Sequence, residues 1–218
     1  MADKMVILHN YFRSSTSFRV RAALNLKGIA YNQEAWHLRE NQQRSTAYLE
    51  INPQGLVPAL VWTDGTVITQ SMAIMEFLDE VVPQPALLPA DSAGRARVRA
   101  LTQLIGCDIH PLNNLRVLRH IEQEFGADSE AQANWFRHWV RASFDPLEKM
   151  LSSSPQTGEF CHGDSPGMAD ITLAAQLVNN RRFELNVESW PTIHRIGLAC
   201  FAHDAFDKAL PGNQPDAE

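Results

Sequence analysis

Cysteine is scarce in this sequence, and its few cysteines form no recognised motif. The 218 residues include only Cys107, Cys161 and Cys200. Because their number is odd and their spacing wide, we expect reduced thiols in a cytoplasmic protein and no disulfide framework. The eight histidines supply no metal-ligand spacing, so no metal site is expected.

Long apolar runs and excess positive charge are also missing. No stretch approaches the roughly 20 apolar residues of a membrane-spanning helix, and Met5 to Leu8 is too short for the core of a signal peptide. The formal net charge of −6 gives no general attraction to nucleic acid or to an anionic membrane surface. We therefore expect neither partner, and an anionic ligand would have to be held by local arginines.

The first part of the chain alternates between strand and helix patterns. The expected strands are Met5–Asn10, Tyr31–Trp36, Val57–Trp62 and Thr66–Ile68, and the expected helices are Ser15–Lys27, Gln42–Ile51 and Ser71–Val82. Gly28 is a natural end for the first helix, and Asp64-Gly65 predicts the turn of a hairpin. The first three elements can form a βαβ unit.

A proline-rich segment separates this part from a helical one. Residues 83–89 contain three prolines and are typical of a linker. The helices expected beyond it are Asp91–Glu124 with a bend at Pro111, Asp128–Leu151, Gly167–Arg182 and Thr192–Ala202, and the tail from Pro211 is expected to be loose. The expected fold class is α/β plus all-α, with domains at residues 1–83 and 90–218.

Three short motifs stand at turns of the first part. The serine-rich segment Arg13–Arg21 lies between the first strand and the first helix. Backbone N–H groups at a helix start are unpaired and positively polarised, so hydroxyl groups there can either cap the helix or face a ligand. The other motifs are Val57-Pro58, which suggests a turn with a cis peptide bond, and Gln70-Ser71 at a helix start.

Together and in this order, the motifs resemble those of the glutathione transferase superfamily. The resemblance is strongest to the zeta class, which includes the maleylacetoacetate and maleylpyruvate isomerases, and extends over nearly the whole chain. It rests on Ser14, Ser15, Ser17, Arg19, Val20, Arg21, Ala23, Leu24, Lys27 and Gly28, and in the tail on Gln214, Pro215 and Asp216. It implies a thioredoxin-like glutathione-binding domain followed by a helical substrate-binding domain.

The same resemblance implies glutathione as the cofactor. Ser14 matches the serine whose hydroxyl faces the glutathione sulfur and favours its thiolate over the thiol, and the helix start at Ser15 would add to this effect. Many zeta-class members have Cys where this chain has Thr16, so no reactive enzyme cysteine is expected there. The other glutathione contacts that the resemblance implies are Gln43, Val57, Pro58, Gln70 and Ser71, with His110 and Asn114 from the helical domain.

Three arginines are implied to hold the substrate. The stretch with Arg182 resembles the Arg-Phe of zeta-class isomerases, and with Arg13 and Arg116 it offers three guanidinium groups that could meet near the thiolate. Arginine binds carboxylates bidentately, which suits a dicarboxylate. His110 and Asn114 are four residues apart and would share a helix face. By residue type alone, these side chains could equally lie on solvated surface, face a partner subunit or complement a helix C-terminus.

The activity implied by the resemblance is glutathione-dependent cis–trans isomerisation of a diketo dicarboxylate. The thiolate adds to the cis alkene, the resulting single bond rotates, and elimination gives the trans isomer and regenerates glutathione. Maleylacetoacetate is the first choice of substrate and maleylpyruvate the second. The alternatives are a glutathione transferase acting on α-halo acids and, from another class, a non-catalytic glutathione- or ligand-binding protein. The superfamily also implies a homodimer.

Overall fold

The computed structural model describes residues 5–218. The chain divides into two compact units, the first ending at Leu87 and completed by His203–Glu218, and the second formed by Leu88–Ala202. This division differs from the expected domains, 1–83 and 90–218, because residues 203–218 pack with the first unit.

The first unit is built on a four-stranded sheet in the order β2-β1-β3-β4. Its strands are β1 (Val6–Asn10), β2 (Tyr31–Ala35), β3 (Ala59–Val61) and β4 (Val67–Thr69). β2 runs parallel to β1, whereas β3 is antiparallel to both β1 and β4. The expected βαβ unit followed by a hairpin is therefore confirmed, and β1 and β3 lie at the centre of the sheet.

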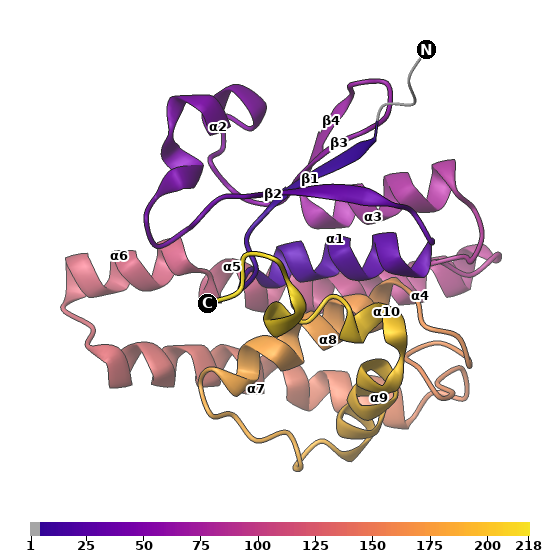
Figure 1. Ribbon diagram of the computed structural model, residues 1–218. Helices are drawn as coiled ribbons and strands as arrows, with labels where there is room; N and C mark the ends of the chain where they lie inside the picture. The colour runs from indigo at the N-terminus through magenta and orange to yellow at the C-terminus, as the bar shows by residue number, and fades with distance from the viewer. Residues whose placement is uncertain (1–4) are drawn as a thin grey trace. The chain divides into compact units, whose positions relative to one another are not determined.

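Helices cover this sheet and connect its strands. They are α1 (Ser15–Leu26), η1 (Gln42–Arg44), α2 (Thr46–Ile51), α3 (Ser71–Val81), α10 (Asp204–Asp207) and η3 (Pro211–Asn213). α1 and α3 lie side by side on one side of the sheet (Figure 1). The prediction of a single helix over Gln42–Ile51 is wrong, because two short helices, η1 and α2, occupy this segment. Ser45 is extended and its hydroxyl caps α2 by accepting a hydrogen bond from the Tyr48 N–H, which breaks the segment in two.

Two groups of buried residues hold the first unit together. Phe18 and Leu24 of α1 are fully buried, as are Leu8 of β1 and Leu60 of β3, and each such side chain stabilises the fold by about 1.5–3 kcal/mol. A second hydrophobic cluster is formed by residues that follow β1, belong to α2 or precede β3. It contains Tyr11, Phe12, Tyr48 and Val57, with Trp36, Leu38 and Ile51 packed against it.

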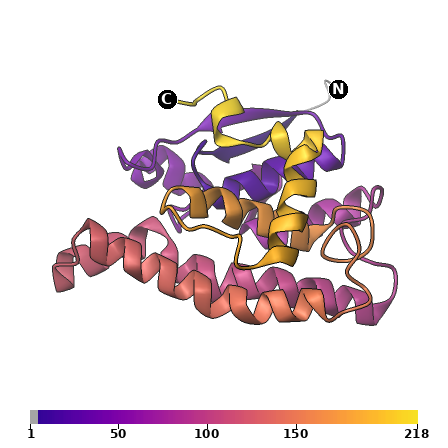
Figure 2. The same cartoon turned by 90° about the horizontal axis from the view of Figure 1, so that it is seen from below.

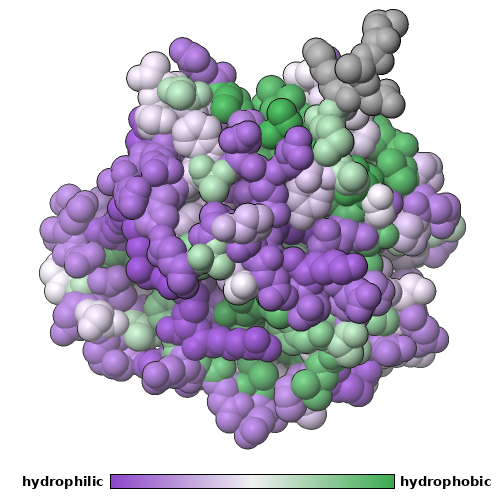
Figure 3. Space-filling view, in the orientation of Figure 1, coloured by the Kyte–Doolittle hydropathy of each residue, from purple (hydrophilic) through white to green (hydrophobic). Residues whose placement is uncertain are grey.

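The second unit is helical throughout its regular structure. It contains α4 (Ser92–Gln103), the π-helix η2 (Leu104–Ile109), α5 (His110–Asn113), α6 (Leu115–Phe125), α7 (Ser129–Ser152), α8 (Met168–Arg181) and α9 (Pro191–Ala202). α7 runs along η2, α5 and α6 (Figure 2). Hydrophilic residues cover most of the molecular face in Figure 3. Within residues 5–218, no helix has the length and apolar character needed to cross a membrane.

The helix expected over Asp91–Glu124 is interrupted twice. Pro111 has no backbone N–H to donate, and just before it the chain widens into a π turn in which the His110 N–H bonds the Ile105 carbonyl. The second interruption is Asn114, which is extended (φ −77°, ψ 160°) and caps α6. The expected bend at Pro111 is therefore a change of helix type followed by a true break.

The tail from Pro211 is folded, so the expectation of a loose tail is wrong. η3 lies within it, and Gln214 is buried. The Gln214 side-chain N–H₂ donates to the carbonyls of Lys208 at 2.8 Å and Leu210 at 2.7 Å. These bonds satisfy a buried amide inside the tail itself, a feature that a polar, proline-containing sequence does not indicate.

Lys27 closes the far end of α1 with a buried ion pair. Its side chain is fully buried, and Nζ donates to Asp79 Oδ1 at 2.7 Å and to the carbonyls of Val82 and Pro85 at 2.6 Å. All three ammonium hydrogens are therefore used.

Replacing Lys27 with Met should lower the free energy of unfolding by about 3–5 kcal/mol, because the Asp79 carboxylate would lose its cation while remaining almost buried. Urea unfolding of the two proteins measures the difference. The exposed Lys149→Met change is the control and should stay within about 0.5 kcal/mol of the parent protein. Equal stability of Lys27→Met and the parent would contradict this assignment.

Candidate active site

The candidate site begins where β1 passes into α1. Ser14 is the N-cap of α1 (φ −72°, ψ 120°), and its Oγ accepts a hydrogen bond from the Ser17 N–H at 3.1 Å. Ser15 is the first residue of the helix and, like Ser14, is half-buried. The capping role left open by the sequence is thus real for Ser14. Capping uses the Ser14 oxygen only as an acceptor, so the hydroxyl still has one hydrogen to donate.

Thr16 decides where that hydrogen points. Its Oγ1 donates to the Val57 carbonyl at 3.0 Å and lies 2.8 Å from Ser14 Oγ. Because Thr16 has a single hydroxyl hydrogen and gives it to Val57, Ser14 must donate to Thr16. The Ser14 hydrogen is thus held by a neutral acceptor, and a stronger, charged acceptor nearby can take it over.

Val57 brings β3 to the same place. The Val57–Pro58 peptide bond is cis, as the motif suggested. Two donors fix the preceding carbonyl of Leu56: Tyr48 Oη at 2.6 Å and Asn52 Nδ2 at 2.7 Å. Burial raises the pKa of Tyr48 to about 12, so the phenol keeps its hydrogen at neutral pH and remains a donor. Tyr48 and Asn52 thus hold the backbone next to Val57 in place. The sequence motifs did not indicate this role.

The start of α3 forms a third part of the site in the first unit. Gln70 has a positive φ of 67°, a conformation that costs a non-glycine residue about 1–3 kcal/mol and is typical of functional sites. Its side chain is exposed and donates to Gln54 Oε1 at 2.8 Å. Ser71 is buried, and its Oγ accepts from Nη1 of the buried Arg19 at 3.3 Å. Arg19 and Ser71 are 52 residues apart, and no local sequence pattern predicts the hydrogen bond between them.

Gln43 is the remaining expected contact in this unit. It lies in η1, is buried, and its Oε1 has no hydrogen-bond partner within the described residues. A buried side-chain acceptor without a donor is costly, and a bound ligand with an N–H group would satisfy it.

In the second unit, Asn114 does not lie on the helix that was expected to carry it together with His110. His110 begins α5 and is half-buried, but α5 ends at Asn113. The Asn114 side chain accepts from the N–H groups of Arg116 and Val117 and donates to the Pro111 carbonyl at 2.9 Å. The expectation that His110 and Asn114 share one helix face is wrong, because the helix breaks between them.

Of the three arginines, Arg13 lies in the first unit, and Arg116 and Arg182 lie in the second. In the first unit, the Arg13 guanidinium stacks over the Phe12 ring at 5.1 Å. In the second, Arg116 is exposed near the start of α6, and Arg182 is exposed at the end of α8, with Nη1 3.4 Å from Asn179 Oδ1. Their meeting around one substrate stays a prediction.

The comparisons with known proteins agree with this geometry. Residues 13–81 match the family model of the glutathione S-transferase N-terminal domain. A maleylpyruvate isomerase of Ralstonia sp is 46% identical over 96% of this chain and 99% of its own. A maleylacetoacetate isomerase of Pseudomonas aeruginosa is 44% identical over 96% of this chain and 97% of its own.

Two solved structures extend the match to the whole fold. One is a holo maleyl pyruvate isomerase, a bacterial glutathione S-transferase in the zeta class, with a TM-score of 0.95, 45% identity, and coverage of 97% of this chain and 100% of that one. The other is a maleylacetoacetate isomerase from Methylobacterium extorquens AM1 with bound malonate and GSH, with a TM-score of 0.94, 39% identity, and coverage of 97% and 99%. The fold is thus that of a glutathione transferase. This chain belongs to the zeta-class family of maleylacetoacetate and maleylpyruvate isomerases.

The residues present fit a glutathione molecule. The Ser14 hydrogen is available to a sulfur anion, and the first N–H groups of α1 add positive potential there. Val57 still has an unused carbonyl lone pair after its bond from Thr16, as pairing with a peptide backbone requires. The buried Oε1 of Gln43 needs a donor, which the peptide N–H and ammonium groups of such a ligand can supply.

Removing the Thr16 hydroxyl tests whether Ser14, Thr16 and Val57 are linked by these two hydrogen bonds. Thr16→Val should lower the free energy of unfolding by about 1 kcal/mol, because Ser14 loses its acceptor and Val57 a donor. Thr16→Ser keeps both bonds and should match the parent protein. Chemical unfolding of all three proteins decides the matter, and a Thr16→Val protein as stable as the Thr16→Ser protein would show that the chain of bonds is absent.

Proposed function

We propose that this chain is a glutathione-dependent cis–trans isomerase of a diketo dicarboxylate. The observation that carries the proposal is the position of the Ser14 hydroxyl, which caps α1 and is linked through Thr16 to the Val57 carbonyl. Such a place presents a hydroxyl hydrogen, a helix N-terminus and a backbone carbonyl together. These three features suit a peptide ligand that carries a thiol.

Bound glutathione would supply a sulfur nucleophile that adds to the cis double bond of the substrate and so allows rotation about that bond. The protein's task is to keep that sulfur ionised near neutral pH. Ser14 donates its hydrogen to the anion and leaves Thr16, while the Ser17 N–H keeps the hydroxyl oxygen in place at 3.1 Å. The α1 N-terminus favours the same charge by about 0.3–1 kcal/mol, or more where it is partly buried.

The peptide part of the cofactor needs fixed partners. Ser71 and Gln70 begin α3 and would hold the γ-glutamyl end, with Arg19 orienting the Ser71 hydroxyl. Val57 would pair with the cysteinyl backbone, and Gln43 would contribute its buried oxygen. His110 would add a further contact, whereas the Asn114 side chain is already engaged in capping α6.

Guanidinium groups suit the carboxylates of the substrate. Arg13, Arg116 and Arg182 carry charges that arginine retains at all physiological pH values, and each can bind a carboxylate with two parallel hydrogen bonds. A substrate oxygen that gains negative charge during double-bond rotation needs donors fixed in advance, which the same groups can supply.

Two substrates remain candidates. Maleylacetoacetate is the first, and maleylpyruvate, which is shorter, is the second. The curated relatives with these activities are 44% and 46% identical to this chain, a difference too small to decide between them.

We also propose that the protein is a cytoplasmic homodimer. The free thiols of Cys107, Cys161 and Cys200 suit a reducing compartment. The proposal of a homodimer rests on the fact that members of the superfamily usually form homodimers, and sedimentation equilibrium would test it.

The deciding experiment is an absorbance assay of each substrate, with and without glutathione. Glutathione-dependent conversion of one in preference to the other identifies the substrate. Binding of glutathione with no conversion of either would reject the isomerase and leave the non-catalytic alternative, and a stable conjugate formed with an α-halo acid as the sole product would favour the transferase.

Replacing Ser14 with Ala should lower kcat roughly 10- to 100-fold, with a smaller change in the KM for glutathione. The expected loss corresponds to about 1.5–3 kcal/mol for a hydrogen bond to a charged group. Because Ser14 also caps α1, about 1 kcal/mol of stability should be lost too, so rates are compared at a temperature where both proteins are folded. Ser92→Ala, at the first position of α4, is the matched control, and a Ser14→Ala enzyme with unchanged kcat would refute the role of Ser14.

A further inference from the structure

The tail from His203 onward is bonded to the start of the first unit at several points. The Arg21 guanidinium donates to the Ala209 carbonyl through Nε at 3.2 Å and Nη2 at 3.0 Å. The Asn25 side chain donates to the Ala205 carbonyl at 2.9 Å. α1 therefore holds the first half of the tail and directs the second half toward the loop that precedes Ser14.

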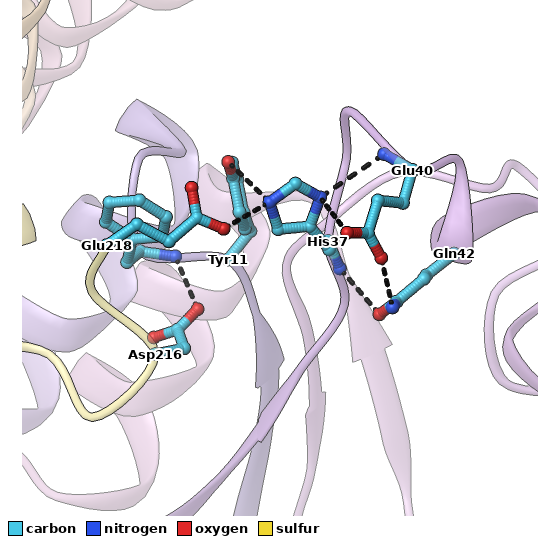
Figure 4. Close-up of polar contacts among 7 residues, drawn as sticks. Tyr11, His37, Glu40, Gln42, Asp216 and Glu218 are labelled. Atoms are coloured by element: carbon cyan, nitrogen blue, oxygen red, sulfur yellow. Dashed lines mark hydrogen bonds and ion pairs between the residues drawn. The ribbon is translucent and has the colours of Figure 1, made fainter.

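Asp216 completes this connection. Its Oδ2 accepts a hydrogen bond from the Phe12 backbone N–H at 2.9 Å, across 204 residues of sequence. The side chain is half-buried. Figure 4 shows Asp216 and Glu218 on the tail, with Glu218 bonded to His37 at 2.6 Å. His37 Nε2 in turn lies 3.5 Å from Tyr11 Oη, so two tail carboxylates flank one short loop.

That loop carries Ser14, and the backbone N–H and carbonyl groups of Tyr11 and Phe12 within it are all hydrogen-bonded. The Tyr11 N–H donates to Ser17 Oγ, and the Tyr11 carbonyl accepts from the Ser14 N–H at 3.0 Å. The Phe12 carbonyl accepts from Arg21 Nη2 at 3.0 Å. These partners all come from α1 or from the loop itself. The Phe12 N–H is bonded instead by the tail, two residues before Ser14.

The charge of Asp216 does not favour a nearby sulfur anion, because like charges repel. Burial lowers the pKa of the Arg21 guanidinium to about 10, and the negative charge of Asp216 raises it in part. Toward Ser14, the bond between Asp216 and the Phe12 N–H acts by fixing the loop and not by the negative charge of the carboxylate. A neutral acceptor of the same shape should serve the loop equally well.

We propose that Asp216 is a positioning residue for Ser14. By holding the Phe12 N–H, it sets the entry of the loop into α1 and hence the direction in which the Ser14 hydroxyl points. The inference rests on the proposed role of Ser14 toward the glutathione sulfur. It makes the tail a part of the active site without direct contact with substrate or cofactor.

The test uses full-length Asp216→Ala and Asp216→Asn proteins, with Glu218→Ala as the control that removes a neighbouring tail carboxylate. Three quantities are measured: the pKa of the thiol in the binary glutathione complex, from its ultraviolet thiolate absorbance; the Kd of glutathione; and kcat and KM for isomerisation. Asp216→Ala should raise the thiol pKa by about one unit, equivalent to tenfold, and lower kcat about tenfold. The Kd of glutathione, measured at a pH low enough for the bound thiol to be protonated in every protein, should stay within about twofold.

Asp216→Asn retains an oxygen acceptor and should restore both the thiol pKa and kcat, and Glu218→Ala should match the parent, because exposed ion pairs contribute little. A parental thiol pKa in Asp216→Ala would overturn the proposal. A thiol pKa lowered equally in Asp216→Asn and Asp216→Ala would also overturn it, by showing that charge and not position is what matters.

If Asp216→Ala does not fold, Asp216→Glu takes its place. The longer side chain moves the acceptor by one methylene group, so a raised thiol pKa is again expected, and an unchanged one contradicts the proposal. Because the titration needs only glutathione, it remains decisive for Asp216 even if the parent protein converts neither substrate. Failure of the isomerase assignment is thus separable from failure of this one.

Discussion

Burial of the Arg21 guanidinium is the constraint around which the first unit is arranged. The side chain is fully buried in α1 and donates to Asn10 Oδ1 at 2.8 Å and to the carbonyls of Tyr11, Phe12 and Ala209. An isolated buried cation would cost several kcal/mol. Its neutral oxygen partners offset that cost only if the end of β1, the loop before Ser14 and the tail all stay where they are.

This arrangement explains why the candidate site is pre-formed. The Ser14 hydroxyl has its direction set from three sides: by the Ser17 N–H within α1, by Thr16 and the Val57 carbonyl just before β3, and by a loop in which the Tyr11 and Phe12 backbone groups are hydrogen-bonded. A hydroxyl held in this way loses little further freedom when it meets an anion, and pre-organised donors are the usual source of catalytic stabilisation. The bonds of Arg21 to the Ala209 carbonyl and of the Phe12 N–H to Asp216 bring the tail, which is distant in the sequence, to this loop.

Local patterns in the sequence predicted the order of strands and helices, the helix start at Ser14 and the turn at Val57-Pro58, because each depends on neighbouring residues. They did not predict the break at Asn114 or the folded tail. From the sequence alone, Asn114 is compatible with a helix interior and with a helix cap. The break depends on the disturbance of the helix around Pro111, which local patterns do not reveal. The bond from Phe12 to Asp216 spans 204 residues, so no periodicity can reveal it. The roles of Arg19 and Tyr48 depend on bonds that local patterns do not reveal either.

The central claim is that the Ser14 environment ionises the glutathione thiol, and a pH titration of thiolate absorbance in the complex of the unmodified protein with glutathione tests it most directly. The account predicts a bound thiol that is largely ionised at neutral pH, with a pKa below about 7, roughly 1.5 units or more below the value of about 8.5 for a free thiol. A bound thiol that titrates at the same pH as glutathione in solution would contradict it, whatever the protein's activity toward either substrate.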